Sequence, residues 1–84
     1  MNEEQKSKGV EIIVNSRPFT WDNKEISYEQ VIQLAFGTYE TNDQIEYTVA
    51  WILKNDNQSG TLVKGSTLKV KKDMRFNVKR TDRS

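Results

Sequence analysis

One segment of this sequence has the spacing of an amphipathic helix, and the segments on either side alternate like strands. In ISYEQVIQLAFG, residues 26–37, apolar residues recur at intervals of three and four. Ser27 is a helix-capping residue, and Gln30 lies three positions later, as in a capping box. Gly37 occupies the position where a left-handed residue ends a helix. The spacing therefore predicts one short helix with an apolar stripe made of Tyr28, Val31, Ile32, Leu34 and Ala35.

The remaining apolar residues alternate with a period of two, which is typical of half-buried strands. VEIIV (10–14) and IEYTVAWIL (45–53) are the clearest examples. We expect residues 19–21 to pair back on the first strand through a turn at 15–18, where Pro18 supplies turn chemistry.

The last part of the chain reads as a loop followed by a hairpin. Residues 54–60 have loop composition, and Leu62 and Val63 are expected to close one edge of the core. Residues 68–78 form the hairpin, which turns at Lys72-Asp73 and returns through Met74, Phe76 and Val78.

This element order predicts a two-layer α+β domain. It is similar to the order of a β-grasp, or ubiquitin-like, domain, and by that analogy the first and last strands are neighbours at the centre of the sheet. We expect a mixed four- to five-stranded sheet with one helix packed on one face. The expected boundaries are a disordered lead-in at 1–9, a domain at 10–79 and a flexible tail at 80–84.

Composition excludes several classes of function. The 84 residues support one modest core, and 13 Lys and Arg against 12 Asp and Glu give a net charge of +1, so neither nucleic acid nor a membrane is a predicted partner. Cysteine and histidine are absent, which removes the usual nucleophiles, proton shuttles and zinc ligands. We expect no enzyme activity, no metal and no cofactor. The polar N-terminus and the absence of a long apolar run predict a cytoplasmic protein.

Three stretches carry a resemblance to a known family. IIVNSRPFTWDNKEISYEQVIQLAF, YTVAW and GTLVKGSTLKVKKDMRFNVKRTDRS, within residues 12–84, resemble the bacterial multiubiquitin family of ubiquitin-like domains. Genes of that family often lie beside genes for ubiquitin-activating-like and ubiquitin-conjugating-like enzymes and a protease. The resemblance therefore implies a protein modifier, with those enzymes and a processing protease as its partners.

The resemblance gives the tail a role. In such a modifier an activating enzyme uses ATP to convert the terminal carboxylate into an acyl adenylate, here at Ser84, and residues Arg80, Thr81, Asp82 and Arg83 would dock on that enzyme. Ubiquitin-type tails end in two glycines, whereas the last glycine of this sequence is Gly65. Three possibilities follow: the enzyme accepts a terminal serine, clipping creates another terminus, or the domain is never conjugated. The "TD-basic-S" ending belongs to the resemblance and favours activation at Ser84.

Strand alternation predicts a second surface, on the sheet face away from the helix. It has a small apolar centre within a polar rim, as partner-binding surfaces do. The alternative function is accordingly a non-covalent β-grasp adaptor that binds partner proteins through this face. Its predicted residues are Ile13, Thr48, Ala50, Ile52, Arg75 and Asn77.

Overall fold

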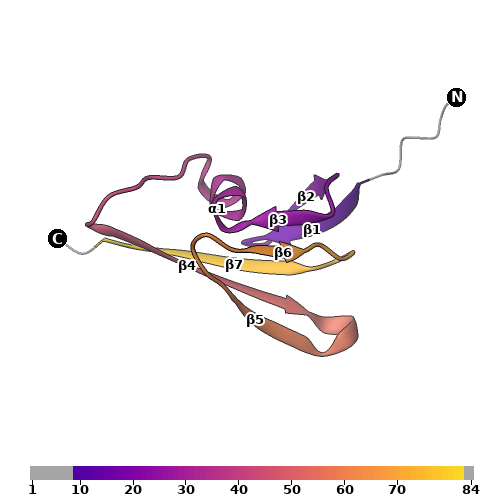
Figure 1. Cartoon of the computed structure of the whole chain (residues 1–84). Helices are drawn as coiled ribbons and strands as arrows, with labels where there is room; N and C mark the ends of the chain where they lie inside the picture. The colour runs from indigo at the N-terminus through magenta and orange to yellow at the C-terminus, as the bar shows by residue number, and fades with distance from the viewer. Residues whose placement is uncertain (1–8, 83–84) are drawn as a thin grey trace, which may run out of the picture.

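The computed structural model describes residues 9–82 (Figure 1). Seven strands, one α-helix and a short 3-10 helix make up this part of the chain. In chain order they are β1 (Val10–Val14), β2 (Arg17–Trp21), β3 (Glu25–Ser27), α1 (Tyr28–Phe36), β4 (Ile45–Leu53), η2 (Lys54–Asp56), β5 (Gln58–Leu62), β6 (Thr67–Lys69) and β7 (Arg75–Asp82).

Five of the strands form one mixed sheet in the order β2-β1-β7-β4-β5. The first and last strands are neighbours within the sheet, as predicted. They run parallel to each other, whereas the other pairs of this sheet are antiparallel. Helix α1 lies over one face of this sheet (Figure 1). The predicted α+β architecture, a mixed sheet with one helix packed on it, is confirmed.

The helix has the predicted caps at both ends. The Ser27 hydroxyl accepts a hydrogen bond from the Gln30 backbone N–H (3.1 Å), and the Gln30 side-chain oxygen accepts one from the Ser27 N–H (2.9 Å). Gly37 follows the helix at φ 80°, and its N–H donates to the Gln33 carbonyl at 2.7 Å. Two backbone donors at the start and one carbonyl at the end are thereby satisfied, which fixes the length of α1.

A single core lies between α1 and the sheet. The sheet contributes alternate residues of β1, β4 and β7, and the helix contributes the side that faces them. The residues that are at most 2% exposed are Ile12, Val14, Ile26, Val31, Ile32, Val49, Met74 and Phe76.

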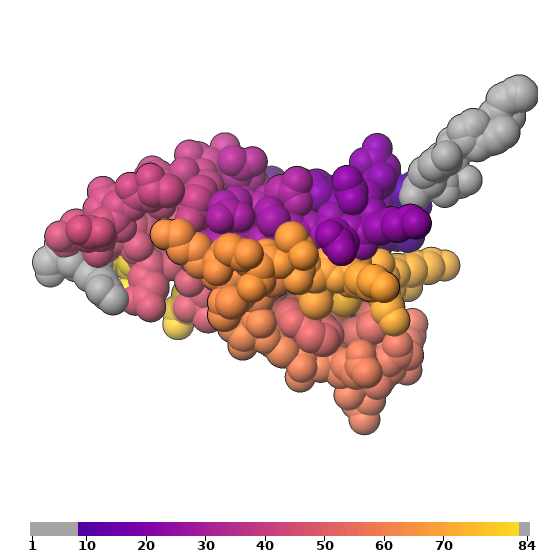
Figure 2. Space-filling view, viewed as in Figure 1, coloured from indigo at the N-terminus to yellow at the C-terminus, as the bar shows by residue number. Residues whose placement is uncertain are grey.

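The final hairpin was predicted wrongly. β6 pairs with β3 in a separate two-stranded sheet, and not with β7. The turn at 72–73 exists, but the backbone that enters it lies beside Lys24 and not beside β7: the Val70 N–H donates to the Lys24 carbonyl at 2.9 Å. In Figure 2 this segment, in orange, crosses the middle of the molecule between the N-terminal half and the β4–β5 strands.

The prediction of a loop at 54–60 is also wrong in part. Only its first residues leave the sheet, as η2, and from Gln58 the chain forms β5 along β4. Leu62 is buried as expected, whereas Val63 is 57% exposed because it lies beyond the last paired residue. The turn after β1 is shorter than the predicted turn at 15–18: it consists of Asn15 and Ser16, and Arg17 and Pro18 already belong to β2.

The last strand is longer than the predicted domain boundary at residue 79. β7 continues to Asp82, so Arg80, Thr81 and Asp82 pair with Tyr47, Glu46 and Ile45 of β4. The predicted tail at 80–84 therefore has to be revised for these three residues, which form the end of a strand. They have strand partners because β4 begins as early as Ile45. Arg83, Ser84 and the lead-in before Gly9 lie outside the described residues.

Candidate partner-binding surface

The predicted surface lies where β1, β7 and β4 run side by side, on the face of the sheet away from the helix. Arg75 of β7 lies opposite both Ile13 of β1 and Ile52 of β4. Two residues further along, Ala50 lies opposite Asn77. These five residues, together with Ser16 and Phe76, line a shallow hollow of about 270 Å³, which we call the sheet-face hollow.

The sheet-face hollow combines an apolar floor with the guanidinium group of Arg75. Ile52 is 41% exposed, while Ile13 and Ala50 beside it are half-buried, so the three form one small apolar patch. Arg75 and Asn77 are exposed and supply hydrogen-bond donors at its rim. The arrangement can bury one apolar side chain of a partner and hold a neighbouring carboxylate or carbonyl oxygen.

The sequence identified most of this hollow but not all of it. Thr48 lies on the same face but pairs with Lys79, one step beyond the lining residues. Ser16 was missed, because the turn of β1 reaches the hollow only through the parallel pairing of β1 with β7. A second hollow of about 220 Å³ shares Ile13 and Arg75, and its other lining residues are Lys54, Asn55 and Asp73.

The turn that carries Ser16 has a defined geometry. Asn15 and Ser16 have φ values of 51° and 71°. Two successive positive φ values between antiparallel strands are the signature of a type I′ hairpin turn. The turn fixes the antiparallel register of β1 and β2, in which Val14 lies opposite Arg17.

The end of β7 is held to the body of the domain by Arg80. Its guanidinium lies 3.1 Å from a Glu40 carboxylate oxygen and 3.2 Å from one of Asp82. All side chains from Lys79 to Asp82 are exposed, so this end of the strand adds nothing to the core. Of the four predicted tail-docking residues, Arg80, Thr81 and Asp82 are strand residues, and Arg83 lies outside the described part.

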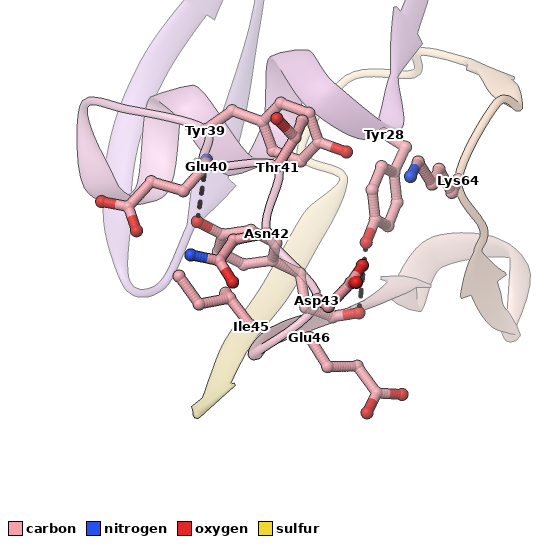
Figure 3. Close-up of a pocket in the computed structure, with 10 residues that line it drawn as sticks. Tyr28, Tyr39, Glu40, Thr41, Asn42, Asp43, Ile45, Glu46 and Lys64 are labelled. Carbon is pink, nitrogen blue, oxygen red and sulfur yellow. Dashed lines mark hydrogen bonds between the residues drawn. The ribbon is translucent and has the colours of Figure 1, made fainter. Parts of the chain in front are cut away.

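A larger depression lies beside this end of the sheet, and sequence analysis did not predict it (Figure 3). It has a volume of about 510 Å³ and three tyrosines in its wall, and we call it the tyrosine hollow. The Tyr39 ring packs against the rings of Tyr28 and Tyr47, with centroids 6.0 and 5.6 Å apart. Its other lining residues are Glu40, Thr41, Asn42, Asp43, Ile45, Glu46 and Lys64.

Hydrogen bonds fix two of these tyrosines. The Tyr28 hydroxyl donates to the Tyr47 carbonyl at 3.3 Å, and the Tyr47 hydroxyl accepts from the Glu40 backbone N–H at 3.2 Å. Both bonds are drawn in Figure 3. Burial raises the pKa of Tyr28, and the nearby Tyr39, Glu29, Tyr47 and Glu46 raise it further. The phenol therefore stays neutral at physiological pH and remains a hydrogen-bond donor.

Within residues 9–82, no helix is both long and apolar enough to span a bilayer. The same part of the chain contains no group of three acidic, histidine or cysteine residues placed to hold a metal ion.

The strand order, the central parallel pair and the helix over one face define a ubiquitin-like α+β domain, a class that is generally non-catalytic. The model of the multiubiquitin family matches residues 10–82, and the chain therefore belongs to the multiubiquitin family. The match includes every strand of the domain and α1. Comparisons with curated proteins and with solved structures gave no match.

Proposed function

We propose that this ubiquitin-like domain is a bacterial, cytoplasmic protein modifier. Its carboxyl end, at Ser84, is activated by a ubiquitin-activating-like enzyme and passed through a ubiquitin-conjugating-like enzyme to a target protein. The observation that carries the proposal is the multiubiquitin family match across residues 10–82. The course of β7 supports it, because the strand reaches the end of the sheet with exposed side chains from Lys79 to Asp82.

The chemistry requires only a carboxylate from this chain. An oxygen of the carboxylate attacks the α-phosphorus of ATP, and pyrophosphate leaves to give an acyl adenylate. A nucleophile of the activating enzyme then takes the acyl group, and AMP leaves. The ubiquitin-like domain contributes a rigid body that the enzyme grips and an end that the enzyme can reach.

The test is activation in the presence of ATP and the candidate activating enzyme. Intact mass spectrometry should find an adenylate or an enzyme-linked ester with the full chain and none with a chain that lacks Arg83 and Ser84. A product that forms equally well without these residues would contradict activation at Ser84. Prior cutting by a processing protease would appear as a shortened chain that is still activated.

The sheet-face hollow favours a second candidate, a non-covalent adaptor. Its apolar floor and the 41% exposed Ile52 support direct binding of a partner protein. Ile52→Asp should then abolish the ATP-independent binding of a partner. Val63→Asp is the matched control, because Val63 is also an exposed aliphatic residue but lies outside the hollow. Partner affinity that is equal for Ile52→Asp and the native chain would exclude this surface.

A further inference from the structure

The five-stranded sheet has two edge strands, and only one of them is protected against pairing. β2 carries Arg17 and Pro18, and both a charge and a missing backbone donor oppose the addition of another strand. β5, the other edge, has the sequence QSGTL, with no charged residue and no proline. Within residues 9–82 it pairs with β4 alone, and Figure 1 shows it as the outermost strand. The backbone N–H and C=O groups on its outer side are therefore open to a further strand.

The two faces of β5 differ. On the helix side Leu62 is buried and Gly60 is half-buried. On the other face Ser59 and Thr61 are exposed, where they lie opposite Ile52 and Ala50 of β4. The three central residues of β5 are thus all small, and their side chains leave the middle of the edge accessible.

The indole ring of Trp51 covers Gly60 on the helix side. A Cβ at Gly60 would lie 2.9 Å from both Nε1 and Cζ2 of that ring. Trp51 is half-buried, so part of the ring is open to solvent beside the edge of the sheet. Glycine is a weak strand residue because it has no side chain to pack, and an aromatic ring that covers it compensates for this. The ring therefore supplies apolar cover at the middle of the open edge.

β5 is complementary to a second copy of itself in the antiparallel direction. Residues opposite each other in an antiparallel pair lie on the same face, so a two-fold axis between two copies of β5 lies beside one residue of each. Only an axis at Gly60 pairs all five residues of the strand. The opposing pairs are then Gly60 with Gly60, Ser59 with Thr61, and Gln58 with Leu62.

The charges beyond the two ends of β5 also match. Asp56 lies in η2, just before β5, and Lys64 follows β5. Both side chains are exposed, and no ion pair within residues 9–82 uses either of them. An axis at Gly60 brings Asp56 of each copy to the end of the strand pair where Lys64 of the other copy lies. Lys54, the other charge of η2, directly follows Leu53 and therefore lies on the β4 side of the hairpin.

We propose that two copies of the chain pair through β5, antiparallel about Gly60, so that their two five-stranded sheets become one continuous sheet. Backbone hydrogen bonds hold the pair, and the Ser59 and Thr61 hydroxyl groups lie opposite each other on the outer face. The two Trp51 rings cover the paired glycines, on the side where both helices lie. The contact is small, so the dimer is weak and reversible. It does not depend on the proposed modifier function, because it uses neither the carboxyl end nor the sheet-face hollow.

Sedimentation velocity of the full chain over a wide range of concentrations tests this pairing. The native chain should form dimers and no larger species, since the two-fold contact is closed and β2 is protected. The double variant Ser59→Lys, Thr61→Lys should weaken dimerisation about tenfold or more, because each lysine then lies opposite a lysine of the other copy. The matched control, Thr20→Lys with Thr67→Lys, makes the same charge change at exposed strand residues outside β5 and should dimerise like the native chain.

A charge reversal at one position tests the register. In the double variant Ser59→Lys, Thr61→Glu each lysine lies opposite a glutamate of the other copy, so dimerisation should return at least to the native level. Pairing centred on Ser59 or on Thr61 would place identical charges opposite each other and would keep this variant monomeric. Hydrogen exchange gives a second measurement: the amides of residues 58–62 should exchange more slowly as the concentration of the native chain rises.

A mixture keeps the result decisive if a variant is less stable. Ser59→Lys, Thr61→Lys mixed with Ser59→Glu, Thr61→Glu should form one-to-one dimers, although each alone stays monomeric. Native chains that stay monomeric at every concentration would overturn the proposal. Dimers that the two lysines leave unchanged would overturn it as well, and so would a mixture that does not associate.

Discussion

The side-chain amide of Asn15 forms two hydrogen bonds with the backbone of Val78, which is 63 residues away in the sequence. The Asn15 Nδ2 donates to the Val78 carbonyl at 3.1 Å, and the Val78 N–H donates to the Asn15 Oδ1 at 2.8 Å. The Asn15 backbone N–H donates to the Phe76 carbonyl at 2.9 Å. One residue thus extends the parallel pairing of β1 and β7 past the end of β1.

Asn15→Gly should lower the free energy of unfolding by about 1–3 kcal/mol, since it leaves part-buried backbone groups of Val78 without their partner. Glycine tolerates the φ of 51°, so the loss reports the side-chain hydrogen bonds and not backbone strain. Urea unfolding measures it. Ser16→Gly is the control at the neighbouring positive-φ position and should change stability little. Equal stability of Asn15→Gly and the native chain would refute this role.

Gly60 is required by the indole ring of Trp51, which lies across from it on β4. A Cβ at Gly60 would lie 2.9 Å from two atoms of that ring. Gly60→Ala should therefore destabilise the domain by about 1–3 kcal/mol, as overpacking does. Thermal unfolding tests this, with Thr61→Ala as the exposed neighbouring control. Combining Gly60→Ala with Trp51→Leu should cost less than the sum of the two single changes, because the clash is then removed.

Tyr28 should ionise at higher pH than an ordinary tyrosine, because burial raises its pKa above 10.0. The folded state then holds the proton more tightly than the unfolded state. The stabilisation is complete below the ordinary value and is lost as the pH rises through the raised one. Spectrophotometric titration should show a tyrosine ionisation step at a pH above the ordinary range. Tyr28→Phe should abolish that late step, and its persistence in the variant would assign it to another residue.

The end of β7 should open before the rest of the sheet. Arg80 to Asp82 have exposed side chains, whereas Phe76 and Val78 are anchored in the core. Hydrogen exchange should therefore be faster in the amides of residues 80–82 than in those of residues 76–78.

Glu40→Gln should raise exchange at the end of β7 by up to about fivefold, since an exposed ion pair contributes about 0.2–1 kcal/mol. Exchange at Val78 should not change. Uniform protection along β7 would show that this end is not a separate opening unit.

Local pattern determined several elements of this protein. The Ser27 and Gly37 caps set the limits of α1, and strict alternation set β4 at residues 45–53, because both signals depend only on neighbouring residues. The same alternation placed Ile13, Ala50 and Ile52 on the outer face, and the structure brings them together in the sheet-face hollow.

Tertiary pairing decided the rest. The sequence QSGTL lacks the alternation and β-branched enrichment of a strand, and it becomes β5 because β4 offers it an open edge. β6 pairs with β3 and not with β7, and β7 extends to Asp82 only because Ile45 lies opposite. The tyrosine hollow joins α1, the segment before β4 and Lys64, which no sequence spacing relates. Such features depend on which segments meet in space, and contacts between distant residues leave no local pattern in a single chain.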